Sequence, residues 1–144
     1  MLEITGDLFD YPVIVIPTNG IVKTDGRLVM GAGVALEAVK RFKDIDLFLG
    51  NKVTYEGNQC YLYTTTNTYV ISFPTKNHYK DSRNLELIET STKQLIILTN
   101  KLNFEKVYLP RVGCGLGNLD WITEVKPLLQ RYLDDRFIIV TKDG

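Results

Sequence analysis

The chain has 144 residues, a length typical of one domain with a full hydrophobic core. Hydrophobic residues make up 44% of the chain and charged residues 24%, and 17 basic residues balance 17 acidic ones. This zero net charge argues against non-specific attraction to nucleic acids or membranes, although it leaves room for a local basic patch.

The cysteines and the apolar runs do not suggest an exported or membrane protein. Cys60 and Cys114 lie far apart, with no CxxC motif and no cluster of histidines, so neither a disulfide framework nor a zinc site is expected. The N-terminal segment is acidic where a signal peptide would be basic, and no run of 18 apolar residues occurs. We therefore expect a cytoplasmic monomer that needs no metal or cofactor and binds no membrane.

The first third of the chain predicts strands and one clear helix. Residues 2–5 form a short candidate strand, and the β-branched run at 12–17 is typical of a strand buried on both faces of a parallel sheet. An apolar stripe that ends in basic residues predicts a helix over 34–43. Residues 44–52 are expected to form a short helical or irregular connector.

The middle third predicts a hairpin and a long helix. Two candidate strands, at 59–65 and 68–73, are separated by a connection short enough for a hairpin. The apolar stripe over 85–102 predicts a helix, with Asp81 or Ser82 as the candidate N-cap.

The last third predicts a buried strand at 107–109, a helix from about Trp121, and a closing strand at 136–141. Pro127 lies six residues past Trp121, so that helix either begins late or bends. Strands that alternate with helices indicate βαβ units. With the hairpin, this predicts one α/β domain over 1–144, a three-layer α/β/α fold with a mixed, mostly parallel central sheet.

The segment from Pro110 to Trp121 carries the clearest ligand signal, because Gly113, Gly115 and Gly117 stand at alternate positions between a strand and a helix. Glycine lets a ligand approach the main chain, and successive N–H groups beside a helix N-terminus bind anions. A tight turn without a ligand is the alternative. Three glycines so close together exceed what a turn needs, which favours a phosphate-binding loop.

Two further loops follow predicted strands at the same edge of the sheet, where open α/β sheets bind their ligands. The loop at 18–33 contains Asn19 and four glycines, and the loop at 74–84 contains Lys76 and the only histidine, His78. Dinucleotide and P-loop motifs are both absent from the first loop: Leu36 stands where the dinucleotide fingerprint needs glycine or alanine. Two glycine-lined loops remain, which suit a ligand with a diphosphate.

Short motifs in register along nearly the whole chain now suggest a family. They are Gly6-Asp7-Leu8, Pro17-Thr18-Asn19-Gly20, Val29-Met30-Gly31-Ala32-Gly33-Val34-Ala35 and Gly113-Cys114-Gly115-Leu116-Gly117. In this order and spacing the chain resembles the macrodomain family. The segments 73–76 and 117–121 are similar to the branch that holds the antitoxin macrodomains of DNA ADP-ribosylating toxin–antitoxin pairs and the human terminal ADP-ribose protein glycohydrolase.

The resemblance implies that the chain binds ADP-ribose or an ADP-ribosylated substrate. Asp7 would accept a hydrogen bond from the adenine amino group, with Leu8 beside it. Asn19 would touch the distal ribose near the bond to be cut and so assist catalysis. The two glycine loops would wrap the diphosphate and distal ribose with main-chain N–H groups, through Gly31, Ala32, Gly33, Val34, Gly113, Cys114, Gly115, Leu116 and Gly117.

The resemblance also implies that Lys76 is the catalytic residue, which attacks or stabilises the opened sugar carbon C1″. A lysine nucleophile must be partly neutral at pH 7, although its ordinary pKa is about 10.4. Lys80 and Arg83 are close enough in sequence to supply a cationic field that favours the neutral amine. The human enzyme has a catalytic aspartate where this chain has Gly117, and Asp120, three residues further on, is a candidate catalytic acid.

Several of these residues also have structural interpretations. Asp7 and Asn19 could serve only to turn the chain, and Asp120 could be the N-cap of the following helix. Cys114 lacks a visible partner base and is expected to pack rather than react. Trp121 is expected to lie in the core beneath the glycine loop.

Three functions follow from the resemblance. The first is a hydrolase that uses Lys76 to remove ADP-ribose from a modified protein or DNA. The second is a phosphatase acting on ADP-ribose 1″-phosphate, and the third is a reader that binds ADP-ribose without chemistry. A neutral domain can still accept a single modified nucleotide of DNA flipped into its site.

Overall fold

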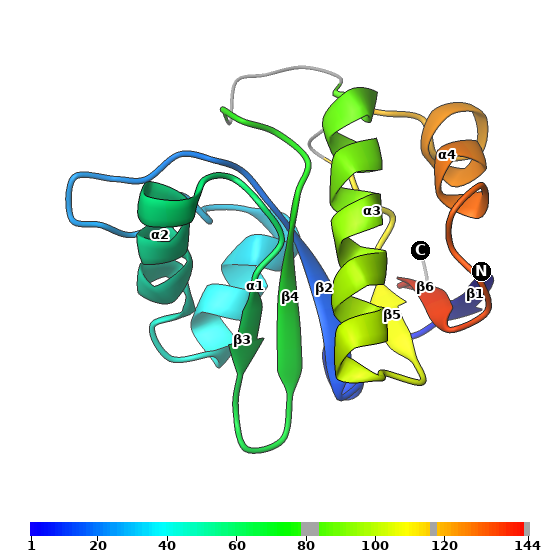
Figure 1. Ribbon diagram of the computed structural model, residues 1–144, viewed down its shortest axis with the longest axis horizontal. Helices are drawn as coiled ribbons and strands as arrows, with labels where there is room; N and C mark the ends of the chain where they lie inside the picture. Colours follow the sequence, from blue (N-terminus) through cyan, green and yellow to red (C-terminus); the bar gives the residue numbers. More distant parts are fainter. Residues whose placement is uncertain (79–83, 116–117, 143–144) are drawn as a thin grey trace.

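The computed structural model describes residues 1–78, 84–115 and 118–142. A six-stranded sheet in the order β1-β6-β5-β2-β4-β3 lies between two layers of helices (Figure 1). The strands are β1 (Leu2–Thr5), β2 (Val13–Thr18), β3 (Leu62–Thr64), β4 (Tyr69–Pro74), β5 (Val107–Leu109) and β6 (Phe137–Thr141). The helices are η1 (Leu8–Asp10), α1 (Gly33–Arg41), α2 (Ile45–Glu56), α3 (Leu85–Leu102), η2 (Trp121–Val125) and α4 (Lys126–Gln130).

The sheet is mixed and mostly parallel, as predicted. Strand β2 pairs in parallel with both β4 and β5, and β6 pairs in parallel with β5 and β1. Only β3 runs antiparallel to its neighbour β4 among the described strands. The predicted three-layer α/β/α architecture is therefore confirmed.

Strand β2 explains why two separate cores form. Val13 and Val15 pack into the core on the side of α3 and α4, and Ile14 and Ile16 pack into the core on the side of α1 and α2. All four side chains are buried. A β-branched run without polar residues is what a strand covered on both faces requires.

The hairpin is shorter than predicted on its first strand. Only Leu62–Thr64 pairs with β4, whereas the prediction began at residue 59. Side chains satisfy the preceding main-chain donors instead: the N–H of Tyr61 donates to Ser72 Oγ at 2.9 Å, and that of Cys60 donates to Gln94 Oε1 at 2.9 Å. The N–H of Ser72 still donates to Tyr61 O at 2.9 Å, so at Tyr61 one main-chain bond to β4 remains beside the side-chain bond.

Helix α2 is a full helix of 12 residues rather than a short connector. Apolar residues do not keep to one face of this helix: Ile45 and Leu49 are buried, but Leu47, between them in the sequence, is exposed. Gly50 lets the helix approach the 18–33 loop, since a Cβ there would collide with the main-chain oxygen of Gly26. Packing against the sheet and this loop, more than its own periodicity, determines the helix.

The final helical segment starts at Trp121 and changes from π-helical to α-helical geometry at Lys126, the residue before Pro127. Residues 121–125 form a π-helical turn, and α4 continues from Lys126. Pro127 has no N–H group and cannot donate the regular helical hydrogen bond. The wider π-helical turn before it accommodates the proline ring. Of the two alternatives from the sequence, the late start is what the structure shows for the α-helix, which begins at Lys126 after a π-helical turn.

The N-cap of α3 is Asn84, whose side chain accepts a hydrogen bond from the N–H of Leu87 at 3.0 Å. Asp81 and Ser82, the candidates from the sequence, lie outside the described residues. The helix itself, Leu85–Leu102, and strand β5, Val107–Leu109, have the predicted bounds. Among the described residues, no helix combines the length and the apolar character that a membrane span requires.

Candidate functional site

The three glycine- and lysine-bearing loops leave one edge of the sheet. Because β2, β4 and β5 are parallel neighbours, their carboxyl ends point the same way (Figure 1). The loops after β2 and β4 are also joined directly: the N–H of Thr75 donates to Thr18 O at 2.9 Å, and the N–H of Gly20 donates to Asn77 O at 3.0 Å. The arrangement expected from the sequence is thus present.

The first glycine loop ends in an exposed helix N-terminus. Residues 31–33 are exposed, and the N-cap position of α1, Ala32, offers no side-chain hydrogen bond to the helix. A Cβ added to Gly31 or Gly33 would meet no atom within 4 Å, and Gly33 has a φ of 58°. The uncapped N–H groups at the start of α1, including that of Val34, are therefore available to an anion from solvent.

The second glycine loop combines a structural glycine with an open one. Gly113 has a φ of 77°, and a Cβ there would lie 2.8 Å from Ile88 Cδ1. Gly115 has no atom within 4 Å of its Cβ position and is exposed. The N–H of Cys114 already donates to Arg111 O at 3.2 Å, so it is less suited to a ligand than its neighbours.

Two residues assigned to this loop, Leu116 and Gly117, lie outside the described residues, as do Lys80 and Arg83 near Lys76. The predicted contribution of Leu116 and Gly117 to ligand binding stays a prediction. So does the proposed effect of the two cations on the lysine.

Asp7 and Leu8 lie where β1 ends, next to the end of β6, because the N–H of Gly6 donates to Thr141 O at 2.9 Å. Asp7 Oδ1 accepts a hydrogen bond from the N–H of Phe9 at 3.0 Å and caps the short helix η1. Leu8 is buried. The turn-forming role of Asp7 is thus visible, and its second carboxylate oxygen has no hydrogen-bond partner among the described residues.

Asn19 organises the loop that carries it. Its Nδ2 donates to Val29 O at 3.0 Å, and its Oδ1 accepts from the N–H of Ile21 at 3.0 Å. The side chain is half-buried. This supports the turn interpretation, while a second amide hydrogen remains available for a ligand.

Lys76 and His78 both follow β4 and are half-buried. The main chain of Lys76 is held from another part of the fold, because Asn58 Nδ2 donates to Lys76 O at 3.0 Å. Asn58 gave no signal in the sequence, since it belongs to no motif and lies 18 residues away.

Asp120 is a helix cap. Its Oδ1 accepts hydrogen bonds from the N–H of Thr123 at 2.8 Å and from Thr123 Oγ1 at 2.9 Å, and Glu124 Oε1 accepts from the N–H of Asp120 at 3.1 Å. The main-chain hydrogen bond from Thr123, followed by that from its hydroxyl, lowers the pKa of Asp120. A catalytic acid needs the opposite shift, so these contacts favour the capping interpretation.

Cys114 and Trp121 take structural positions, as expected. Burial raises the pKa of the Cys114 thiol to about 11, which disfavours the reactive thiolate. Trp121 is buried, and its indole N–H donates to Glu3 Oε1 at 3.1 Å.

Glu3 also pairs with Lys126, whose Nζ lies 2.6 Å from Glu3 Oε2. This contact lowers the pKa of the Glu3 carboxyl. No pattern in the sequence indicated this pair.

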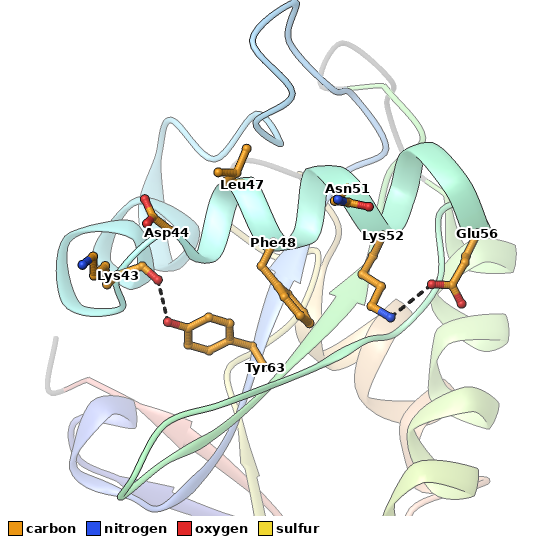
Figure 2. A pocket seen from close by; sticks show the side chains of 8 residues that line it. All are labelled: Lys43, Asp44, Leu47, Phe48, Asn51, Lys52, Glu56 and Tyr63. Carbon is orange, nitrogen blue, oxygen red and sulfur yellow. Dashed lines mark hydrogen bonds and ion pairs between the residues drawn. The ribbon is translucent and has the colours of Figure 1, made fainter.

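Two surface hollows are lined by other residues than the predicted site residues. One, of about 440 Å³, lies between α2 and β3 (Figure 2). There Tyr63 Oη donates to Lys43 O at 2.6 Å, and Lys52 pairs with Glu56 at 3.1 Å. The other, of about 350 Å³, lies between α3 and the segment that contains η2 and α4. None of the predicted site residues that the structure describes lines either hollow, so volume alone does not identify the site. Among the described residues, no cluster of His, Cys, Asp and Glu could hold a metal ion.

Comparison with known proteins identifies the family. The family model of the macro domain matches residues 23–126. The chain belongs to the macrodomain family. The macrodomain architecture also accounts for the mixed sheet and for the edge at which the loops meet.

Relatives of this macrodomain include a DNA ADP-ribosyl glycohydrolase of Thermus aquaticus, 29% identical over 142 residues, which cover 91% of this chain and 37% of the relative. The chain thus spans about a third of the length of the curated relatives it matches. The macrodomain of Thermus aquaticus DarG superposes with a TM-score of 0.81 at 27% identity, over 99% of this chain and 97% of that one. Thermosipho africanus DarTG, in complex with ADP-ribose, gives a TM-score of 0.80 at 24% identity, over 97% of this chain and 42% of that one, and shows the shared fold.

The contrast between the two described glycines of the second loop predicts different effects on stability. Gly113→Ala places a Cβ against Ile88 at a positive φ, so we expect a loss of roughly 1–2 kcal/mol in the free energy of unfolding. Gly115→Ala meets open space and should change stability by less than about 0.5 kcal/mol. Urea denaturation of both variants measures this difference, and equal losses would contradict it.

Proposed function

We propose that this macrodomain binds ADP-ribose and hydrolyses the bond between its C1″ carbon and a modified macromolecule, with Lys76 as the catalytic residue. Four loops meet the requirements of such a ligand. They follow β1, β2, β4 and β5, and all four leave the same edge of the sheet.

One observation carries the proposal. Gly31 and Gly115 have open space where a side chain would be, and neither has a positive φ that would by itself require glycine. Glycine at an exposed position costs stability, because it loses more chain entropy on folding than other residues. Open glycines beside an uncapped helix N-terminus are explained by a ligand whose phosphates contact the main chain.

The contacts of Asp7 and Asn19 support roles for these residues at the two ends of the ligand. The second oxygen of Asp7 would accept a hydrogen bond from the adenine amino group, while its first oxygen keeps η1 in place. Asn19 would use its second amide hydrogen toward the distal ribose, at the start of the loop that its other contacts hold together. Main-chain N–H groups of the two glycine loops would bind the diphosphate between these ends.

Lys76 lies after β4, beside the loop that follows β2, because β4 pairs in parallel with β2. Its Nζ would attack or stabilise C1″ as the bond to the acceptor breaks. Asp120, as an ionised cap, would act through its charge or as a base rather than as an acid. DNA is the acceptor that the relatives favour, since several of them are DNA ADP-ribosyl glycohydrolases.

The adenine contact predicts a weaker complex in Asp7→Asn. In asparagine an NH2 group replaces one of the two carboxylate oxygens, so a donor faces either the N–H of Phe9 or the adenine amino group. Isothermal titration calorimetry with ADP-ribose should show about a tenfold increase in Kd, or about 1.4 kcal/mol. Asp10→Asn, on the same turn and exposed, is the matched control and should bind as the wild type does. Unchanged affinity in Asp7→Asn would show that adenine lies elsewhere.

The catalytic assignment predicts that Lys76→Ala lowers kcat by about 100-fold or more and leaves the Kd for ADP-ribose nearly unchanged. Lys101→Ala, at the far end of α3, is the control. Release of ADP-ribose should be measured from thymidine-modified DNA and from protein modified on acidic residues, alongside release of phosphate from ADP-ribose 1″-phosphate.

The three substrates separate the proposed functions. Release from DNA or protein that depends on Lys76 supports the hydrolase, and phosphate release alone would indicate the phosphatase. Tight binding with no turnover of any substrate would indicate a reader. Full activity of Lys76→Ala would rule out the lysine mechanism.

A further inference from the structure

The side-chain amide of Asn58 holds the segment that carries Lys76. Asn58 lies in the turn between α2 and β3, and its Nδ2 donates to Lys76 O at 3.0 Å and to Asn77 Oδ1 at 3.1 Å. One amide therefore supplies both of its hydrogens to two successive residues of the loop after β4.

The same amide packs against Gly20 in the loop after β2. A Cβ on Gly20 would lie 2.8 Å from Asn58 Nδ2 and 2.8 Å from Asn77 O, closer than real Cβ contacts allow. The N–H of Gly20 also donates to Asn77 O at 3.0 Å. Gly20, Asn58, Lys76 and Asn77 thus form one interlock, which joins the loops after β2, α2 and β4.

The other polar atom of the Asn58 side chain, its oxygen, indicates what the amide is used for. Its Oδ1 is buried and has no hydrogen-bond partner among the described residues. A buried acceptor without a partner destabilises a protein, so an apolar side chain would fill this space at less cost. The two N–H donors, and the loop that they hold, account for the presence of an amide here.

We propose that Asn58 is a positioning residue for Lys76 in the hydrolysis proposed above, on which this inference rests. It acts through the main chain of Lys76 and does not touch the substrate. By holding the carbonyl of Lys76 it fixes the point from which the lysine side chain extends toward C1″. Displacements of about 1 Å in a catalytic group can reduce turnover by about 100-fold, which makes such a contact important for kcat.

The test compares variants that open the interlock from its two sides. Asn58→Asp keeps the size of the side chain but removes both N–H donors and places an acceptor against two oxygens, and Asn58→Ala removes the contacts without adding charge. Gly20→Ala pushes on the amide from the other loop. Gln59→Ala is the matched control, because that neighbouring amide donates to Glu56 O at 2.6 Å and leaves the interlock intact.

For each variant, kcat and KM for release of ADP-ribose from thymidine-modified DNA are measured with the Kd for ADP-ribose and the Tm. We expect kcat to fall by about 10- to 100-fold in the three interlock variants. KM and Kd should stay within about threefold of the wild type, because the residues that contact the ligand are unchanged. Gln59→Ala should behave as the wild type does.

Full kcat in the Asn58 variants, beside an active wild type and an inactive Lys76→Ala, would overturn this inference alone. Losses of kcat matched by equal losses of ADP-ribose affinity, or failure of both Asn58 variants to fold, would make Asn58 a general structural residue and overturn it as well. A wild type that releases ADP-ribose from no substrate, or a fully active Lys76→Ala, would remove the proposed function and this inference with it.

Discussion

The parallel pairing of β2 with both β4 and β5 is the constraint on which the rest of the structure depends. It places the carboxyl ends of three strands side by side, in a register where Thr18 lies opposite Pro74. Strand β2 can occupy this central position because its side chains are apolar on both faces and pack into two cores. The loops that leave these ends must then meet, whatever their own conformations.

The glycines at this edge fall into two physical kinds. Gly20 and Gly113 are required by the fold, since a side chain at either position would collide with a neighbouring segment. Gly31 and Gly115 face open space, and nothing among the described residues fills it. Gly33 also faces open space, but its φ of 58° favours glycine by itself. The first kind brings the loops together, and the second leaves their main chain accessible. A ligand that binds through main-chain N–H groups needs both.

Elements with a strong pattern could be predicted from the sequence. Helix α3 and strand β5 have the predicted bounds, because a long apolar stripe and a short, mostly buried run of strand-forming residues each decide the local structure. Helix α2 and residues 59–61 could not be predicted, since contacts with distant segments determine them: Gly50 against Gly26 in the first case, side-chain hydrogen bonds in the second.

The same limit applies to the site. Its loops were recognisable because glycine composition and family motifs are local features of the sequence. The capping role of Asp120 could be predicted, since a cap is also local. Asn58 was missed because its importance arises from a contact between residues far apart in the chain. Tertiary contacts of this kind leave no periodic or motif signal.

The central claim is that main-chain N–H groups of the 31–34 and 113–115 segments together bind the two linked phosphates of ADP-ribose. A crystal structure of the complex tests it most directly. The account predicts phosphate oxygens within about 2.7–3.2 Å of N–H groups from both segments. A diphosphate that contacts only one of them, or that lies in the hollow between α2 and β3, would contradict it.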